Sequence, residues 1–318
     1  MRPISSSIVE VIGNTPLVEL SKLANTLGLE GRLLAKLDYL MPGFSKKDRA
    51  ALRTIEDARA SGDLLDGQTV VELTSGNMGT GLAIVCGHFG HPFVAVMSAG
   101  NSEERAKMMR ALGAEVVIVA QSPGSKKGEV SGEDLALVEE AARRITVERE
   151  AFRADQFVRQ ANTAAHFDGT GPELWEQSEG KLTAFCDFVG SGGTLGGVAR
   201  FLEPKGVACY AVEPEGAEAV SRGDTSTPEH PIQGGGYMMP DLVHLEDVKL
   251  AGTLCVSGTT AAEHARLLAR EEGIFGGYSA GANLAAAVEL LRGPHKGGTV
   301  AFVVCDSGLK YLSTDLWD

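Results

Sequence analysis

Two adjacent lysines, Lys46 and Lys47, stand in the first turn of a helix that the pattern predicts over residues 45–62. Ser45 and Asp48 have the spacing of a capping box, and the glycine at 62 is a natural helix end. A cation is unfavourable at a helix N-terminus, so a lysine there loses its proton more readily and can act as an amine. Taken alone, the stretch favours the simpler interpretation, two solvated lysines.

A glycine-rich turn, FVGSGGTLGG at 188–197, follows an apolar run and opens a predicted helix. Successive backbone amides and two hydroxyls in such a turn can bind one anion, assisted by the helix dipole. The candidate residues are Gly190, Ser191, Gly192, Gly193 and Thr194. The turn is neither GxGxxG nor a Walker loop, so a phosphate on something other than a nucleotide is favoured. A tight turn packed with small residues is the alternative.

Two further turns carry polar side chains before predicted helices. In ELTSGNMGTG, at 72–81, Thr74, Ser75 and Asn77 offer hydroxyl and amide groups suited to a small carboxylate. In GIFGGYSAGANLAAA, at 273–287, Ser279 lies in a glycine-flanked turn. Each could be a simple turn or cap, but together with the lysines they indicate one site.

Apolar, β-branched runs alternate with helical patterns along the whole chain, for example QTVVEL and PFVAVM. Uninterrupted apolar strands between helices predict parallel sheets covered on both faces, and therefore an α/β fold. A helix is expected at 133–145. We place a domain boundary near residue 150, which gives two open α/β domains, 1–150 and 151–318, with the site in the cleft between them.

The composition excludes several classes of function. The formal net charge of −13 argues against nucleic acid or an anionic membrane as a partner. The five cysteines, without a CxxC pair, predict buried, reduced thiols in a reducing compartment. The N-terminus lacks a signal-peptide pattern, and no apolar run is long enough to span a membrane, so a cytoplasmic protein is expected. The histidines and cysteines show no metal-ligand spacing.

The ordered motifs resemble the cysteine synthase and cystathionine β-synthase family of pyridoxal-phosphate enzymes (fold type II, the β family). The resemblance runs nearly end to end. Its motifs are IGNTPLVEL at 12–20, SKKDRAA at 45–51, TSGN at 74–77, QF at 156–157, GTGPELWEQ at 169–177, GSGGTLGG at 190–197, GIFGGYSAGA at 273–282 and DSGLKYLST at 306–314.

The resemblance implies a role for each candidate residue. Because the family pattern is S-x-K-D-R, Lys47 forms the Schiff base with pyridoxal 5'-phosphate and acts as the general base, and Lys46 occupies the variable position. Asn77 contacts the ring hydroxyl, the 190–194 turn holds the phosphate, and Ser279 faces the pyridine nitrogen. Substrate binding is implied for Thr74, Ser75, Met78, Gln156 and Tyr237.

Two departures bear on the substrate. The TSGN turn is followed by Met78 where cysteine synthases usually have threonine; plant β-cyanoalanine synthases also have methionine there. The GGGYMMP segment at 234–240 places Tyr237 near the site, as a tyrosine lies in cystathionine β-synthases. Met78 could instead be helix packing, and Tyr237 a surface residue.

The resemblance implies β-replacement on a serine- or cysteine-derived amino acid through an α-aminoacrylate, as in a cysteine synthase that joins O-acetylserine and sulfide. The same chemistry with another donor or nucleophile is the alternative: a β-cyanoalanine synthase, a cystathionine β-synthase-like enzyme or a cysteine desulfhydrase. A third hypothesis is a cofactor-binding homologue without catalysis, but the lysine and the phosphate turn are intact. A homodimer and a serine acetyltransferase partner are further implications.

Overall fold

The computed structural model describes residues 4–74, 76–125, 130–222, 230–236 and 242–318. Within these residues the strands form a six-stranded sheet, in the order β1-β2-β10-β7-β8-β9, and a four-stranded sheet, in the order β5-β4-β3-β6. The strands are β1 Leu17–Glu19, β2 Arg32–Lys36, β3 Val70–Leu73, β4 Phe93–Ser98, β5 Glu115–Val119, β6 Phe152–Arg153, β7 Ala184–Phe188, β8 Ala208–Pro214, β9 Gly252–Val256 and β10 Thr299–Val303. The α-helices are α1 Ser21–Thr26, α2 Lys47–Ser61, α3 Asn77–Phe89, α4 Glu103–Ala111, α5 Gly132–Glu148, α6 Ala161–Ala165, α7 Gly171–Gln177, α8 Gly193–Leu202, α9 Gly258–Glu272 and α10 Tyr278–Arg292.

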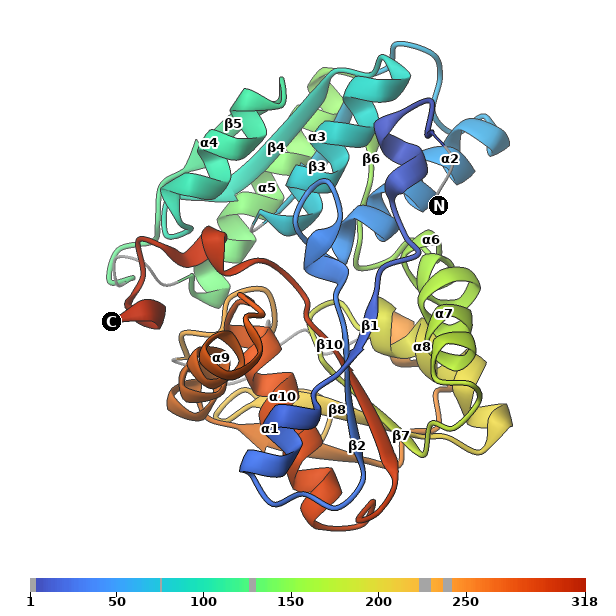
Figure 1. Ribbon diagram of the computed structural model, residues 1–318. Coiled ribbons are helices and arrows are strands. Elements are labelled where there is room, and N and C mark those ends of the chain that lie inside the picture. The colour runs from blue at the N-terminus through green and yellow to red at the C-terminus, as the bar shows by residue number, and fades with distance from the viewer. Residues whose placement is uncertain (1–3, 75, 126–129, 223–229, 237–241) are drawn as a thin grey trace.

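The predicted α/β class with two parallel sheets is confirmed, because every strand pairing among the described residues is parallel except that of β1 with β2. The sheets do not follow the contiguous division expected near residue 150. Strands β1 and β2, from the N-terminal part of the chain, pair into the larger sheet through β10. In Figure 1 the smaller sheet and its helices lie at the top, and the chain crosses between the two lobes several times.

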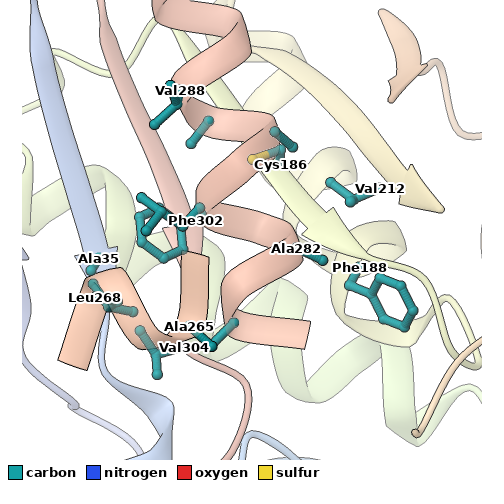
Figure 2. Packing of buried hydrophobic residues seen from close by; sticks show 14 of the residues in the cluster. Ala35, Cys186, Phe188, Val212, Ala265, Leu268, Ala282, Val288, Phe302 and Val304 are labelled. Carbon is teal, nitrogen blue, oxygen red and sulfur yellow. The ribbon is translucent and has the colours of Figure 1, made fainter. Parts of the chain in front are cut away.

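Alternate side chains of the strands in the larger sheet point to opposite faces of the sheet. Helices cover both of these faces. On one face, Cys186 of β7 and Phe302 of β10 pack with residues of α9 and α10 such as Leu268 and Val288 (Figure 2). On the other face, a second apolar cluster joins the sheet to α7 and α8. This two-sided burial explains the uninterrupted apolar runs in the sequence.

The smaller sheet is covered in the same way. Helix α5 packs on one face through Val138, Ala141, Ala142 and Ile145, the side chains that share its buried face. Helices α2, α3 and α4 contribute to the cluster on the opposite face. The helix predicted at 133–145 is therefore confirmed, and it begins with a capping box between Ser131 and Asp134.

The start of α2 differs from the prediction. Ser45 and Asp48 form no capping box: Asp48 Oδ2 instead accepts a hydrogen bond from the Gly43 amide at 2.5 Å, and the Ser45 hydroxyl is buried without a partner. The predicted end is confirmed, because Gly62 adopts a left-handed conformation with φ of 81°. A carboxylate near a helix start thus has more than one possible amide partner, and spacing alone does not choose between them.

All five cysteines are free, and four of them are buried as predicted, but Cys255, in the edge strand β9, is exposed. In the described part of the chain, no group of three or more His, Cys, Asp or Glu side chains is placed to hold a metal ion. No helix in the same part is both long enough and apolar enough to cross a membrane.

Candidate active site

One pocket is lined by segments that lie far apart in the sequence. It brings together Lys47 at the start of α2, Asn77 at the start of α3, residues 190–194 before and at the start of α8, and Ser279 at the start of α10. We call residues 190–194 the glycine turn. Four helices therefore begin at this pocket, and their N-termini give it a positive electrostatic potential.

The two adjacent lysines have different surroundings. Lys46 Nζ lies 2.6 and 2.8 Å from the carboxylate oxygens of Asp187, whereas Lys47 Nζ donates a hydrogen bond to Ser191 Oγ at 3.2 Å. Burial, and next the charge of Lys46, lower the pKa of Lys47 to about 8. Burial also opposes the charge on Lys46, but the Asp187 carboxylate outweighs it and holds the pKa of Lys46 above its ordinary value. Lys47 is thus the lysine that more readily supplies a neutral amine.

The glycine turn has no room for side chains. Gly192 has a φ of +85°, which L residues rarely adopt. A Cβ on Gly190 would lie 2.4 Å from the carbonyl oxygen of Gly234, and one on Gly193 would lie 2.3 Å from Asn162 Oδ1. The first amides of α8 have no partner within the helix, so they can donate to an anion. The turn has the form of a phosphate cradle.

Two hydroxyls of the glycine turn are held by buried partners. Ser191 Oγ accepts a hydrogen bond from Asn162 Nδ2 at 2.9 Å, and Thr194 Oγ1 lies 3.2 Å from His166 Nε2. Burial lowers the pKa of His166 well below its ordinary value, so its ring is neutral at pH 7. Asn162 and His166, which hold these two hydroxyls, are therefore both uncharged.

The amide of Asn77 is fixed from both ends by the C-terminal segment. Asn77 Nδ2 donates to Asp306 Oδ2 at 2.7 Å, and Lys310 Nζ donates to Asn77 Oδ1 at 2.7 Å. Asp306 also accepts from the Tyr311 hydroxyl at 2.8 Å. Burial lowers the pKa of Lys310 to about 8. These contacts set the orientation of the Asn77 amide at the pocket edge.

Thr74, predicted to bind a substrate carboxylate, lies in the turn before α3. Its Oγ1 accepts hydrogen bonds from the amides of Gly76 and Gly79, at 3.0 and 2.9 Å. The described residues that line the pocket do not include Thr74, although they include Asn77 of the same turn. Its hydroxyl proton is not used by these two bonds. Ser75, the neighbouring prediction, lies outside the described residues.

Gln156 lies behind the glycine turn, with its side chain almost wholly buried. The backbone carbonyl oxygen of Gln156 accepts a hydrogen bond from Asn162 Nδ2 and lies 2.8 Å from His244 Nε2. Asn162 also donates to Ser191, so the Gln156 segment and the glycine turn share a partner. Tyr237, the last predicted substrate contact, lies outside the described residues.

Met78 does not point into the pocket. Its side chain is 1% exposed and belongs to the apolar cluster between the small sheet and its helices, which includes Ala51, Leu82 and Met109. This placement matches the packing alternative for Met78 and not the predicted substrate contact. Asn77 and Met78 are adjacent on α3, so their side chains point in different directions.

A buried ionic network positions the start of α2. Arg49 binds Glu173 of α7 at 2.6 Å and Asp38 at 3.0 Å, and Lys36 of β2 binds the same Glu173 at 2.6 Å. Thr15 donates to Asp38 at 2.7 Å. Thr15, Arg49 and Glu173 belong to the IGNTPLVEL, SKKDRAA and GTGPELWEQ motifs, respectively. Lys36 is the last residue of β2, and Asp38 follows it closely. The motifs thus meet in space and join the two lobes beside Lys47.

Sequence reasoning missed several residues that line or support the pocket. They are Asp187, Gln233, Gly234, Cys305 and Lys310. One signal was available, because Asp187 is a charged residue inside the buried strand AFCDF. A buried carboxylate requires a partner, and the otherwise unexplained Lys46 was a candidate. Lys310 stands in a recognised motif but gave no local signal of its contact with Asn77.

The chain matches a known family model described as pyridoxal-phosphate dependent enzyme over residues 8–306. It is 38% identical over 317 residues to a cysteine synthase of Staphylococcus aureus, covering 98% of this chain and 96% of the relative. It is 37% identical over 323 residues to the O-ureido-L-serine synthase of Streptomyces lavendulae, covering 99% and 94%. The crystal structure of O-acetylserine sulfhydrylase isoform 3 from Entamoeba histolytica matches with a TM-score of 0.88 at 32% identity, covering 99% and 92%.

The pocket fits the cofactor of this family. It offers one amine of lowered pKa at Lys47, and a cradle at the glycine turn that a Cβ on Gly190 or Gly193 would fill. The polar side chains of Asn77 and Ser279 line the same pocket as Lys47 and the glycine turn. Pyridoxal phosphate has an aldehyde, which reacts with an amine, a phosphate, which needs such a cradle, and a polar ring, which needs polar partners. The chain belongs to the family of pyridoxal-phosphate dependent enzymes.

Proposed function

We propose that this enzyme replaces the β-substituent of a serine- or cysteine-derived amino acid, and that it makes L-cysteine from O-acetylserine and sulfide. The observation that carries the proposal is the pocket, which combines the Lys47 amine, the glycine turn and the Ser279 hydroxyl. The similarity to the staphylococcal cysteine synthase over nearly the whole chain supports the choice of donor and nucleophile.

Each side chain has a role in this proposal. The bound cofactor withdraws electrons from the Cα of an attached amino acid. Lys47 Nζ would hold the cofactor, and once freed by a substrate amine it would act as the base for the Cα proton. The amides of the glycine turn bind the phosphate, and Asn77 contacts the ring hydroxyl. Ser279 would be the partner of the ring nitrogen, and because a hydroxyl would not keep that nitrogen protonated, prompt loss of the β-substituent would be favoured.

The substrate carboxylate is bound by the turn before α3 and by Gln156. Thr74 supports this role because its oxygen accepts two backbone amides and its proton remains for an acceptor. Ser75 and Tyr237 stay predictions from the sequence. Met78 is left out of this set because it is buried in the apolar cluster.

A second candidate is the same chemistry with a different donor or nucleophile. The similarity to an O-ureido-L-serine synthase, nearly equal to that with the cysteine synthase, favours it. The cystathionine β-synthase, β-cyanoalanine synthase and desulfhydrase alternatives belong to this class. All of them use the same cofactor residues and differ in the pocket around the β-carbon.

The proposed assembly is a cytoplasmic homodimer that binds a serine acetyltransferase. Large apolar side chains are exposed beside the site: Phe44 and Leu309 are 43% and 52% exposed, and the Ser307 amide donates to the Phe44 carbonyl between them. Exposed apolar side chains of this kind favour a protein interface. Sedimentation velocity tests the dimer, and co-sedimentation with a serine acetyltransferase tests the partner.

The site is tested by fixing the cofactor with borohydride and mapping the labelled peptide. We expect the label on Lys47. Lys47→Ala should remove the visible absorbance of the bound cofactor and lower turnover by about 10²–10⁴-fold, the range for a general base. Lys46→Arg is the matched control and should keep the covalent cofactor. A label on Lys46 would contradict the proposed register.

The reaction is tested by stopped-flow absorbance with O-acetylserine, serine and cysteine, followed by sulfide, cyanide, homocysteine and water as nucleophiles. We expect O-acetylserine to give the fastest change in the cofactor spectrum, and sulfide to restore it fastest. A faster change with another donor would replace the cysteine synthase proposal by the second candidate. The residues of the cofactor site would be unaffected by that result.

A further inference from the structure

A buried ion pair adjoins the proposed amine. Lys46 is 8% exposed and Asp187 1% exposed, and their charged atoms are 2.6 and 2.8 Å apart. Asp187 Oδ1 also accepts from Asn283 Nδ2 at 3.1 Å, and the Cys305 thiol points at it from 3.6 Å. A buried carboxylate and a buried ammonium are stable only with such partners, so the pair is held in one place.

The pair and Lys47 are held in a fixed relation. Lys46 precedes Lys47 in the chain, and its backbone amide donates to the Cys305 carbonyl at 2.8 Å. Lys46, Lys47 and Asp187 line the same pocket. Lys47 Nζ contacts a hydroxyl, Ser191 Oγ, while the carboxylate of Asp187 is occupied by Lys46. The cation at position 46 therefore takes the carboxylate that would otherwise hold Lys47 as an ammonium.

We propose that Lys46 and Asp187 are a positioning pair: with the carboxylate bound to Lys46, the neutral form of the Lys47 amine, which binds the cofactor, is favoured. This inference rests on the proposed role of Lys47. Lys46 occupies the variable position of the S-x-K-D-R pattern, so the pair is a feature of this chain's own sequence. Replacing the cation alone would leave Asp187 to attract a proton onto Lys47.

The charges around Lys47 agree with this role. Burial lowers its pKa most, the Lys46 charge lowers it further, and Asp187 opposes both. Cys305 and Glu72 also favour the protonated form. The nearby rings of His166 and His244 carry no charge at pH 7, because burial lowers the pKa of each. Among these groups Lys46 is the cation that favours the neutral amine.

The test follows capture of pyridoxal phosphate by the full-length apoenzyme as a function of pH. In capture, Lys47 Nζ adds to the aldehyde carbon, a C=N bond forms, and the aldehyde oxygen leaves as water. The rate rises with the neutral fraction of the amine and is read from visible absorbance. Lys46→Met should raise the apparent pKa of the profile and slow capture at pH 7 by about tenfold, the usual effect of one nearby charge.

Two further variants separate charge from structure. Lys46→Arg keeps the cation and should keep the wild-type profile. The double variant Lys46→Met/Asp187→Asn leaves no unpaired buried charge, and its profile should lie between those of wild type and Lys46→Met. Lys107→Met, which removes an exposed lysine paired with Glu103, is the control and should change nothing.

The outcomes distinguish this inference from the proposed site. If the borohydride label is on Lys47 and the capture profile is the same in all variants, the pair is structural and the inference is overturned. If Lys46→Met is too unstable to measure, an unshifted double variant overturns it and a shift to higher pH supports it. A label on Lys46 in wild type would instead overturn the proposed site itself.

Discussion

Two strand–turn–helix units, one from each sheet, meet at the pocket and face it in different ways. In the larger sheet, β7 leads through the glycine turn into α8; in the smaller sheet, β3 leads through residues 74–76 into α3. The first unit presents backbone amides, with no room for a Cβ at Gly190 or Gly193. The second presents a side chain, that of Asn77, whose orientation depends on other groups.

The two units differ in how strongly their geometry depends on distant parts of the chain. The geometry of the glycine turn follows from its own residues, because Gly192 supplies the left-handed conformation and the missing side chains expose the amides. The Asn77 amide is oriented by Asp306 and Lys310, which are more than 200 residues away in the sequence. The backbone site is built locally, and the side-chain site requires the folded C-terminal segment.

The largest effect should follow from a side chain in the glycine turn. Gly193→Ala places a Cβ 2.3 Å from Asn162 Oδ1, and Asn162 is held by Gln156 and Ser191, so the turn must move. The loss of one charge-assisted hydrogen bond to phosphate costs about 1.5–3 kcal/mol, or roughly 10- to 150-fold in cofactor affinity. Equilibrium dialysis of the cofactor measures this.

The matched control is Gly132→Ala, at the first position of α5. A Cβ there meets nothing within 4 Å, so the variant should retain the cofactor and be slightly more stable, since alanine favours helix over glycine. Equal cofactor affinity in Gly193→Ala and Gly132→Ala would mean that the turn does not approach a ligand closely. The proposal that the glycine turn presents its backbone amides to a ligand would then be wrong.

The same contrast explains what the sequence could predict. The α/β class, helix α5, the left-handed end of α2 at Gly62 and the glycine turn follow from local patterns, and they are found as expected. The sheet membership of β1 and β2, and the Lys46–Asp187 pair, depend on contacts between distant segments. Periodicity carries no information about such contacts. The false capping box at Ser45 has the same cause, since Asp48 binds the amide of Gly43 instead.

An intermediate effect should follow from freeing Asn77. Lys310→Met removes the hydrogen bonds from Lys310 Nζ to the Gly43 carbonyl and to Asn77 Oδ1, at 2.8 and 2.7 Å. We expect the free energy of unfolding to fall by about 2–3 kcal/mol. Because the Asn77 amide can then rotate, cofactor affinity should fall about tenfold and the visible absorbance of the bound cofactor should shift.

Lys296→Met is the control for this variant. It removes an exposed ion pair with Glu30, whose side chains are 60% and 68% exposed, and such a pair contributes at most about 1 kcal/mol. Chemical denaturation and cofactor titration are measured on both variants. A Lys310→Met enzyme that is less stable but binds the cofactor with unchanged affinity and spectrum would show that Lys310 only anchors the C-terminal segment.

The smallest effect on specificity should come from Met78, which is adjacent to Asn77 in sequence but points into the apolar cluster. If Met78 contacted substrate, Met78→Thr would add a hydrogen bond to a charged group and change the donor ratio of kcat/KM by roughly one to two decades. Because its side chain is 1% exposed, we expect that ratio to change by less than about threefold.

Met78→Thr should nevertheless cost about 1–3 kcal/mol of stability, since it buries a hydroxyl among apolar side chains and leaves unfilled volume. Met78→Leu keeps the volume and apolar character, and should cost less than about 1.5 kcal/mol. The two effects separate the hypotheses, because packing moves stability without moving the donor ratio. A tenfold shift toward O-acetylserine in Met78→Thr, with Met78→Leu unchanged, would return Met78 to the substrate site. The side chains that α3 presents to the site would then include Met78 as well as Asn77.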